Sequence, residues 1–362
     1  MAFSINRSTV LYIILLISPL INIINHNLSS TPIVIILGVL LLISLVGLKR
    51  VKNYKEYYFF ITIILYAFFI YLLILASFRA GTLYIIIFFT TPAFLYLYYS
   101  SVFDLKYFIT KHYQQLLKYY IIIIFLSIAC DSFILHVIGD VSLQLMYSET
   151  ALSYHSRPHG ITGNATVNSV LIVFFYSLLL STKANNKGFY FGLISISVYL
   201  QGSGLGFLVY GALFFFIVKQ KRYGSLIAFL GLSLILLLYL FFPITGKLSP
   251  LYYLAMYNVF LEQYSKFILL IGNPSDLMFG NVSGGIDFLP IFLTSNMGFL
   301  YLLLIVCLFV YLILKTKSYY ETVALYLMIL GSLHYPVLFY TFSVFFFPVF
   351  IFKIINYRAL DL

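Results

Sequence analysis

The densest group of chemically active side chains lies in residues 155–169, where the chain reads HSRPHGITGNATVNS. Arg157 carries five donors in a fixed plane, an arrangement suited to binding a diphosphate or a carboxylate. His155 and His159 flank it, and imidazoles exchange protons near neutral pH. These residue types predict a site that binds an anion and moves a proton.

The same segment leads into an apolar run that is long enough to form a helix. Thr162 or Asn164 can cap this helix, and the free N–H groups of a first helical turn favour an anion nearby. In one interpretation the segment binds substrate, with Asn164 and Asn168 among the contacts. In the other it is a solvated loop with an ordinary helix cap, in which Arg157 pairs with Glu149.

A glycine-rich sequence, QGSGLG, occupies residues 201–206 between two short apolar runs. It is no dinucleotide fingerprint, because it does not follow a strand of a βαβ unit. Either Gln201 and the backbone of this turn approach a ligand, or the small residues allow two helices to pack closely.

A second polar region covers residues 243–287. Apolar residues at three- and four-residue spacing in its middle indicate an amphipathic helix, with Glu262 and Lys266 on its polar edge. Turn-forming residues follow and end at Asp287. This region forms either a lid over a site or a simple surface helix.

The whole composition predicts an all-α, polytopic integral membrane protein. Of the 362 residues, 63% are hydrophobic and only 9% are charged, too few to solvate the surface of a soluble protein. Since a spanning helix needs roughly 20 apolar residues, the chain can form about 12 transmembrane helices in a single domain, residues 1–362. The runs lie at 8–24, 33–48, 58–76, 83–102, 120–139, 165–181, 189–201, 205–218, 225–242, 288–314, 322–334 and 337–352.

The basic residues predict the orientation of these spans. With a cytoplasmic N-terminus, all but four of the 21 Lys and Arg residues fall in cytoplasmic connections or tails, as the positive-inside rule requires. The four exceptions are Arg79, Arg157, Lys247 and Lys266. Two outer loops are long, residues 140–164 and 243–287. The net charge of +11 is therefore a topology signal, and nucleic acid is not an expected partner.

Ionisable residues within apolar runs are further candidates, because such positions are costly in a membrane. Asp131 and His136 fall in the fifth run, and His334 lies at the outer end of the eleventh. Arg79 ends the third run and either binds substrate or extends to lipid headgroups. Cys130 and Cys307 are interpreted as small buried apolar residues, and no metal-ligand spacing is present.

In this arrangement the chain resembles the O-antigen polymerase and ligase superfamily of bacterial inner membranes. The resemblance rests on Arg157 with the glycine and asparagines that follow it, on the turn at 202–204, and on a long second outer loop that returns through residues 287–299. Ligases of this superfamily carry a histidine in the second loop, and residues 243–287 contain none. The resemblance therefore favours a polymerase, although the arginine that polymerases carry in that loop is also absent.

The resemblance implies glycosyl transfer on the periplasmic face, with a polyprenyl-diphosphate-linked glycan, such as an undecaprenyl-diphosphate-linked one, as donor and acceptor. Arg157 would hold the diphosphate, His159 or Asp287 would act as the base, and Lys266 would add a second cation. No metal or cofactor is implied. The expected substrate-binding residues are Arg79, His155, Asn164, Asn168, Gln201, Glu262, Lys266 and His334.

Other functions fit the same pattern. A flippase or proton-coupled carrier would also have about 12 spans, although carriers concentrate charge in mid-membrane. An O-antigen ligase is a further alternative, and a membrane acyltransferase would need a carboxylate beside His26. Membrane lipid, a chain-length regulator and a flippase are the partners implied for a polymerase, with both termini in the cytoplasm of a bacterial cell.

Overall fold

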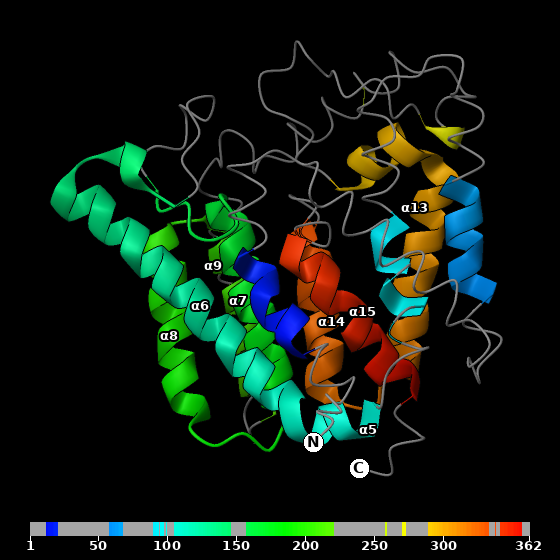
Figure 1. The fold of residues 1–362 in the computed structure, drawn as a ribbon, viewed down its shortest axis with the longest axis horizontal. Helices are drawn as coiled ribbons and strands as arrows, with labels where there is room; N and C mark the ends of the chain where they lie inside the picture. Colours follow the sequence, from blue (N-terminus) through cyan, green and yellow to red (C-terminus); the bar gives the residue numbers. More distant parts are fainter. Residues whose placement is uncertain are drawn as a thin grey trace, which may run out of the picture.

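The computed structural model describes residues 12–20, 58–67, 90–93, 95–97, 99, 105–145, 157–220, 258, 270–272, 289–332, 337 and 341–356. All regular structure in these residues is helical, which confirms the expected fold class at that level (Figure 1). The helices are α5 (Leu105–Phe108), the π-helical turn η3 (Ile109–Tyr113), α6 (Gln114–Phe133), the π-helical turn η4 (Ile134–Ile138), the short 3₁₀ turn η5 (Val141–Leu143), α7 (Ala165–Leu180), α8 (Lys187–Gln201), α9 (Gly204–Lys219), α13 (Leu289–Lys315), α14 (Tyr319–Ser332) and α15 (Thr341–Asn356).

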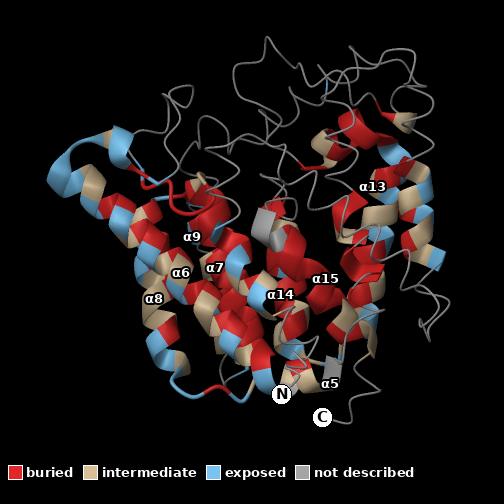
Figure 2. Cartoon of the chain, in the orientation of Figure 1, coloured by how far each residue is buried: buried red, intermediate tan, exposed pale blue. Residues whose placement is uncertain are grey.

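Helix α7 is the centre of the bundle. Every residue from Ala165 to Leu179 is buried, and the helix contacts α6, α8, α9 and α14. Its sequence has no polar face, and a helix that is apolar all round has to be covered on every side. Figure 2 shows this burial, with exposed residues on the outer faces of the surrounding helices and in the loops that join them.

Two helical segments, Lys111–Ile138 and Leu289–Lys315, are long and apolar enough to cross a membrane. The outward face of α13 carries large apolar side chains over most of its length. They are Phe299, Leu300, Leu303, Val306, Val310 and Leu314, all exposed. An apolar strip of this extent requires lipid or protein to cover it, so the fold is compatible with a membrane protein.

Most predicted helix limits agree closely with the structure. The run predicted at 165–181 is α7, and the run at 288–314 is α13. The run predicted at 120–139 begins too late, because helix continues back through η3, where polar residues such as Gln114 and Gln115 are tolerated near a helix end. Similarly, α15 ends at Asn356 rather than 352. The runs at 33–48 and 225–242 lie outside the described residues.

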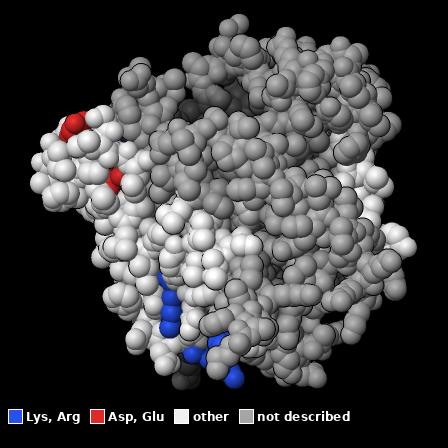
Figure 3. Space-filling view, viewed as in Figure 1, with Lys and Arg blue, Asp and Glu red and all other residues white. Residues whose placement is uncertain are grey.

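The described charges divide between the two ends of the bundle (Figure 3). At one end α7, α9, α13 and α15 terminate while α6, α8 and α14 begin, and we call this the lysine end. Contacts between helix ends define it, for example from the Tyr319 hydroxyl to the Phe216 carbonyl oxygen at 3.0 Å. Its lysines are Lys111, Lys118, Lys183, Lys187, Lys219, Lys315, Lys317 and Lys353. Arg157 and Asp140 lie at the opposite end, which we call the loop end.

Helix α13 is interrupted at Gly298, whose backbone has φ 83° and ψ 165°. A Cβ on Gly298 would lie 2.2 Å from the Leu270 carbonyl oxygen, and one on Gly272 would lie 2.5 Å from the Gly298 nitrogen. The two glycines therefore allow two backbones to cross in contact. The Tyr66 hydroxyl donates to the Met297 carbonyl oxygen at 3.0 Å, which satisfies an acceptor that the break releases.

The two cysteines correct one expectation. Cys130 and Cys307 are both free, as the absence of a C-x-x-C spacing suggested, but both are exposed rather than buried. They lie on the outward faces of α6 and α13, where an apolar surface accepts a small polarizable side chain.

Candidate functional site

The loop that carries Arg157 is fixed to α6 by a buried carboxylate. Asp131 is 0% exposed. Its Oδ2 accepts the Gly160 N–H at 2.7 Å, and its Oδ1 accepts the Leu145 N–H at 2.9 Å. One side chain thus joins both described parts of the outer loop predicted at 140–164. An acid in an apolar run was the sequence signal for Asp131, but its connection to this loop was not foreseen.

A second set of buried groups fixes the same loop to α6 and α7. Ser127 Oγ accepts the Ile161 N–H at 3.0 Å. Asn168 Nδ2 donates to the His159 carbonyl oxygen at 2.6 Å, and its Oδ1 accepts the Thr162 N–H at 3.3 Å. Asn168 was expected to bind substrate, but both its amide nitrogen and its amide oxygen form hydrogen bonds with the loop backbone.

Gly160 makes this arrangement sterically possible. Its φ is 59°, and a Cβ there would lie 2.5 Å from Asn168 Nδ2. A side chain at this position would be strained in the left-handed conformation and would also displace the asparagine. The glycine after Arg157 is thus required for close approach of the loop to α7.

Asn164, and not Thr162, caps helix α7. Its Oδ1 accepts the N–H groups of Thr166 at 2.9 Å and Val167 at 3.2 Å. Two donors that could have bound an anion are therefore already used. The positive charge available to a ligand here is mainly that of Arg157, not that of the helix terminus.

The turn at residues 201–206 packs against the start of α7. Gln201 is 0% exposed, and its Nε2 donates to the Pro158 carbonyl oxygen at 3.1 Å. The Ser203 and Thr166 hydroxyls are 2.8 Å apart. A Cβ on Gly206 would lie 2.6 Å from the Ser169 Cβ. Close packing through small residues, one of the two interpretations, is confirmed, and the described contact of Gln201 is to the loop that holds Arg157.

Arg157 itself is exposed, whereas the five residues after it are buried. Among the described residues it has no ion-pair partner. His159 is only 3% exposed, and its backbone N–H donates to Gln144 Oε1 at 3.3 Å. The structure therefore presents a cation at the surface of a loop whose following residues, His159 among them, are buried and held by the Asp131 carboxylate.

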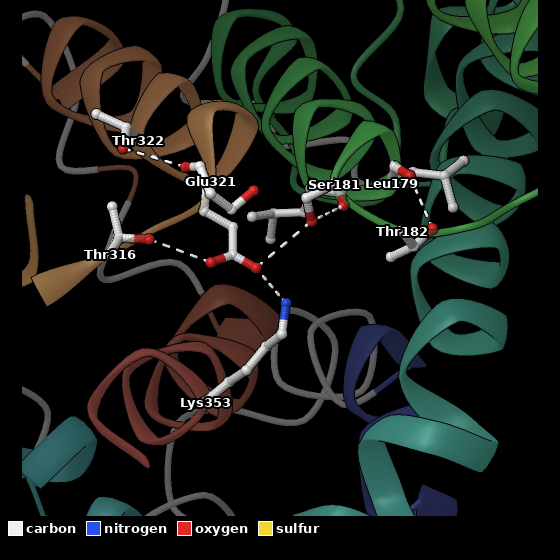
Figure 4. Close-up of polar contacts among 9 residues, drawn as sticks. Leu179, Ser181, Thr182, Thr316, Glu321, Thr322 and Lys353 are labelled. Atoms are coloured by element: carbon white, nitrogen blue, oxygen red, sulfur yellow. Dashed lines mark hydrogen bonds and ion pairs between the residues drawn. The ribbon is translucent and has the colours of Figure 1, made fainter. Parts of the chain in front are cut away.

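A separate polar cluster at the lysine end was missed by sequence reasoning (Figure 4). Glu321 of α14 and Lys353 of α15 form a buried ion pair. Thr316 donates to Glu321 Oε2 at 3.1 Å, and the Ser181 hydroxyl is 3.5 Å from Oε1. Lys353 Nζ also lies 4.6 Å from the centre of the Tyr113 ring. The cluster connects η3, the ends of α7 and α13, α14 and α15.

A sequence signal for this pair did exist. Glu321 is the only acidic residue between Asp287 and Asp361, and Lys353 interrupts an apolar run. An isolated acid and an isolated base in apolar segments tend to pair, since each is costly to bury alone.

The remaining predicted site residues lie outside the described residues: Arg79, His155, Glu262, Lys266, Asp287 and His334. The loop at 243–287 and its expected interfacial helix also lie outside them, apart from residues 258 and 270–272. His136 is described and is exposed in η4. Within the described residues, no group of His, Cys, Asp and Glu side chains could hold a metal ion.

Comparison with known proteins assigns no relative to this chain: no family model, no curated protein and no solved structure matches it.

Proposed function

We propose that this chain polymerises undecaprenyl-diphosphate-linked oligosaccharide units by glycosyl transfer at the periplasmic face of a bacterial inner membrane. In this proposal about 12 helices span the bilayer, the lysine end faces the cytoplasm and the loop end faces the periplasm. The separation of the described lysines from Arg157 supports that orientation.

The observation that carries the proposal is the placement of Arg157. Its guanidinium is exposed and has no carboxylate partner among the described residues. The backbone immediately after it is fixed by the side chains of Asp131, Ser127, Asn168 and Gln201. Preorganised cations stabilise developing charge without reorganisation at the moment of reaction. A planar guanidinium fits two diphosphate oxygens at once.

The proposed reaction needs few groups. A hydroxyl oxygen on the terminal sugar of the acceptor unit attacks the anomeric carbon of the donor glycan. The bond from that carbon to the diphosphate oxygen breaks, undecaprenyl diphosphate leaves, and the hydroxyl proton passes to a base. Arg157 stabilises the leaving diphosphate. His159 or Asp287 accepts the proton.

Of the two candidate bases, the structure describes only His159, and it is buried. His159 is 3% exposed, so it reaches a hydroxyl only if the substrate displaces part of the loop or a proton is relayed. The proposal therefore predicts that Asp287→Asn lowers the rate more than His159→Gln does. If His159→Gln alone abolishes turnover while the fold is kept, His159 is the base and Asp131 is the group that orients it.

The test is a reconstitution in detergent micelles with lipid-linked single repeat units extracted from membranes of the source bacterium. Wild-type protein should produce glycans of several repeats and release undecaprenyl diphosphate. Arg157→Ala should lower the rate on the order of 10²–10³-fold. Lys317→Gln, which removes an exposed cation at the opposite end, is the matched control and should keep full activity. No new glycosidic bond with wild-type protein would refute the proposal.

One observation favours a second candidate, a carrier of lipid-linked oligosaccharides. Interrupted helices often mark the binding sites of transporters, and α13 is interrupted at Gly298. However, the Met297 carbonyl oxygen already accepts from Tyr66, and the side chains of Thr294, Ser295 and Asn296 bond back to their own helix. The described residues at this break therefore leave few groups for a cargo.

A further inference from the structure

A lateral cavity of about 410 Å³ opens between the helical segment Tyr58–Ala67, α13 and α15. Phe59 and Phe60 line it from the segment Tyr58–Ala67, Ile355 from α15, and Cys307, Leu308 and Tyr311 from α13. The volume lies within the ~300–1,000 Å³ typical of ligand sites. The cavity is remote from the loop end, so the proposed glycan site does not account for it.

One cation stands at the end of this cavity. Lys315, the last residue of α13, is part of the lining, and no acidic side chain is among the described residues that form it. Its Nζ lies 5.5 Å from the centre of the Tyr311 ring, which holds the ammonium near the cavity by a cation–π contact. From Lys315 to Cys307 the lining rises along α13 by about 12 Å. The cavity is therefore an apolar slot with a positive charge at its lysine end.

A second void borders the slot on the side of the bundle. A smaller void of about 40 Å³ shares Phe60 and Leu308 as walls and reaches Ala93 and Phe347, with apolar side chains around nearly all of it. An occupant that is apolar and thin could extend in this direction. A helix could not, because a helix with side chains is about 10–12 Å wide.

From this geometry we propose that the cavity binds an anionic phospholipid, with one acyl chain in the slot and the headgroup phosphate on Lys315. The apolar walls fit the chain, and the ammonium of Lys315, which has no carboxylate partner among the described residues, fits the phosphate. In the proposed orientation Lys315 faces the cytoplasmic leaflet, in which anionic lipids attract basic residues by about 1 kcal/mol each. The inference rests on that orientation in a bilayer, but it does not depend on the polymerase activity.

The test measures lipid binding by native mass spectrometry of delipidated protein in micelles, titrated with dioleoyl phosphatidylglycerol or dioleoyl phosphatidylcholine. Wild-type protein should bind the anionic lipid about fivefold more tightly, the ratio that about 1 kcal/mol represents. Lys315→Gln should abolish this preference, and Lys315→Arg should retain it. Lys317→Gln is the matched control, because Lys317 is exposed but outside the lining, and it should behave as wild type.

A second variant tests the slot itself. Cys307→Trp fills the cavity with a large ring and should weaken binding of both lipids. The native cysteines give a further measurement without substitution: phosphatidylglycerol should slow the reaction of Cys307 with N-ethylmaleimide but leave that of Cys130, exposed on α6, unchanged.

Three results would overturn the proposal. Equal loss of preference in Lys317→Gln and Lys315→Gln would show only general surface attraction. Wild-type binding in Cys307→Trp would show that no chain enters the slot. Equal affinity of wild-type protein for the two lipids would show that the phosphate is not recognised.

Discussion

The Glu321 carboxylate and the Lys353 ammonium form an ion pair inside the bundle, joining α14 to α15. Glu321 is 2% exposed and Lys353 is 6% exposed. Removing one partner leaves the other charge buried and uncompensated. We therefore expect Glu321→Gln to lower the free energy of unfolding by about 3–5 kcal/mol, measured by thermal unfolding in micelles followed by circular dichroism.

The double variant separates an ion pair from simple loss of packing. Glu321→Leu combined with Lys353→Met removes both charges, and its loss should be far smaller than the sum of the two single losses. Lys317→Gln, an exposed lysine nearby in sequence, should change the stability by no more than about 0.5 kcal/mol. Additive losses in the double variant would contradict the pairing.

Gly160 and Gly139 provide a matched pair of substitutions. Both have positive φ, 59° and 78°, but a Cβ meets Asn168 at Gly160 and nothing within 4 Å at Gly139. Gly139→Ala should lower the free energy of unfolding by only about 1–2 kcal/mol, because alanine is strained in the left-handed conformation. Gly160→Ala should lower it by at least about 1 kcal/mol more, because Asn168 loses its hydrogen bond to the loop. Equal losses by the same unfolding measurement would show that Asn168 does not hold the loop.

Asn164 should act through its cap and not through contact with substrate. Asn164→Ala should lower the free energy of unfolding by about 1 kcal/mol. Asn164→Asp and Asn164→Ser should keep it close to the wild-type value, because either side chain can accept the same N–H groups. If glycan synthesis recovers along with stability in those variants, the cap explains the residue. Full stability with no synthesis in Asn164→Ser would point to a substrate contact.

Arg157 should show the opposite behaviour. Since it is exposed and without a described ion-pair partner, Arg157→Ala should change the unfolding free energy by no more than about 0.5 kcal/mol while synthesis stops. Arg157→Lys keeps the charge but loses the bidentate geometry, so partial activity is expected. A large stability loss in Arg157→Ala would mean that the residue supports the fold.

Local features of the sequence predicted much of the fold. Helix α7 was predictable because its run contains no charged residue, Gly or Pro and starts directly after an asparagine that can cap it. The run at 288–314 corresponds to α13, but the break at Gly298 was not predicted, because it depends on a second backbone at Gly272. The predicted number of spans is untested by the described residues.

The sequence was a weaker guide to the site, because burial depends on tertiary contacts. Asn168 and Gln201 were expected to face a substrate, yet the structure uses them to support the Arg157 loop. Glu321 and Lys353 lie 32 positions apart, and only the packing of α14 against α15 brings them together. The expected roles of all the site residues stay predictions, and six of these residues lie outside the described part of the chain.

The most direct test of the proposed function is the glycan banding pattern of the source bacterium after deletion of this chain and complementation with wild-type or Arg157→Ala protein. We predict that deletion reduces the long ladder to core plus a single repeat unit, that wild type restores the ladder, and that Arg157→Ala leaves the single repeat. Loss of every repeat, including the single one, would contradict polymerisation and favour a carrier or ligase step. A normal ladder with Arg157→Ala would remove Arg157 from the site.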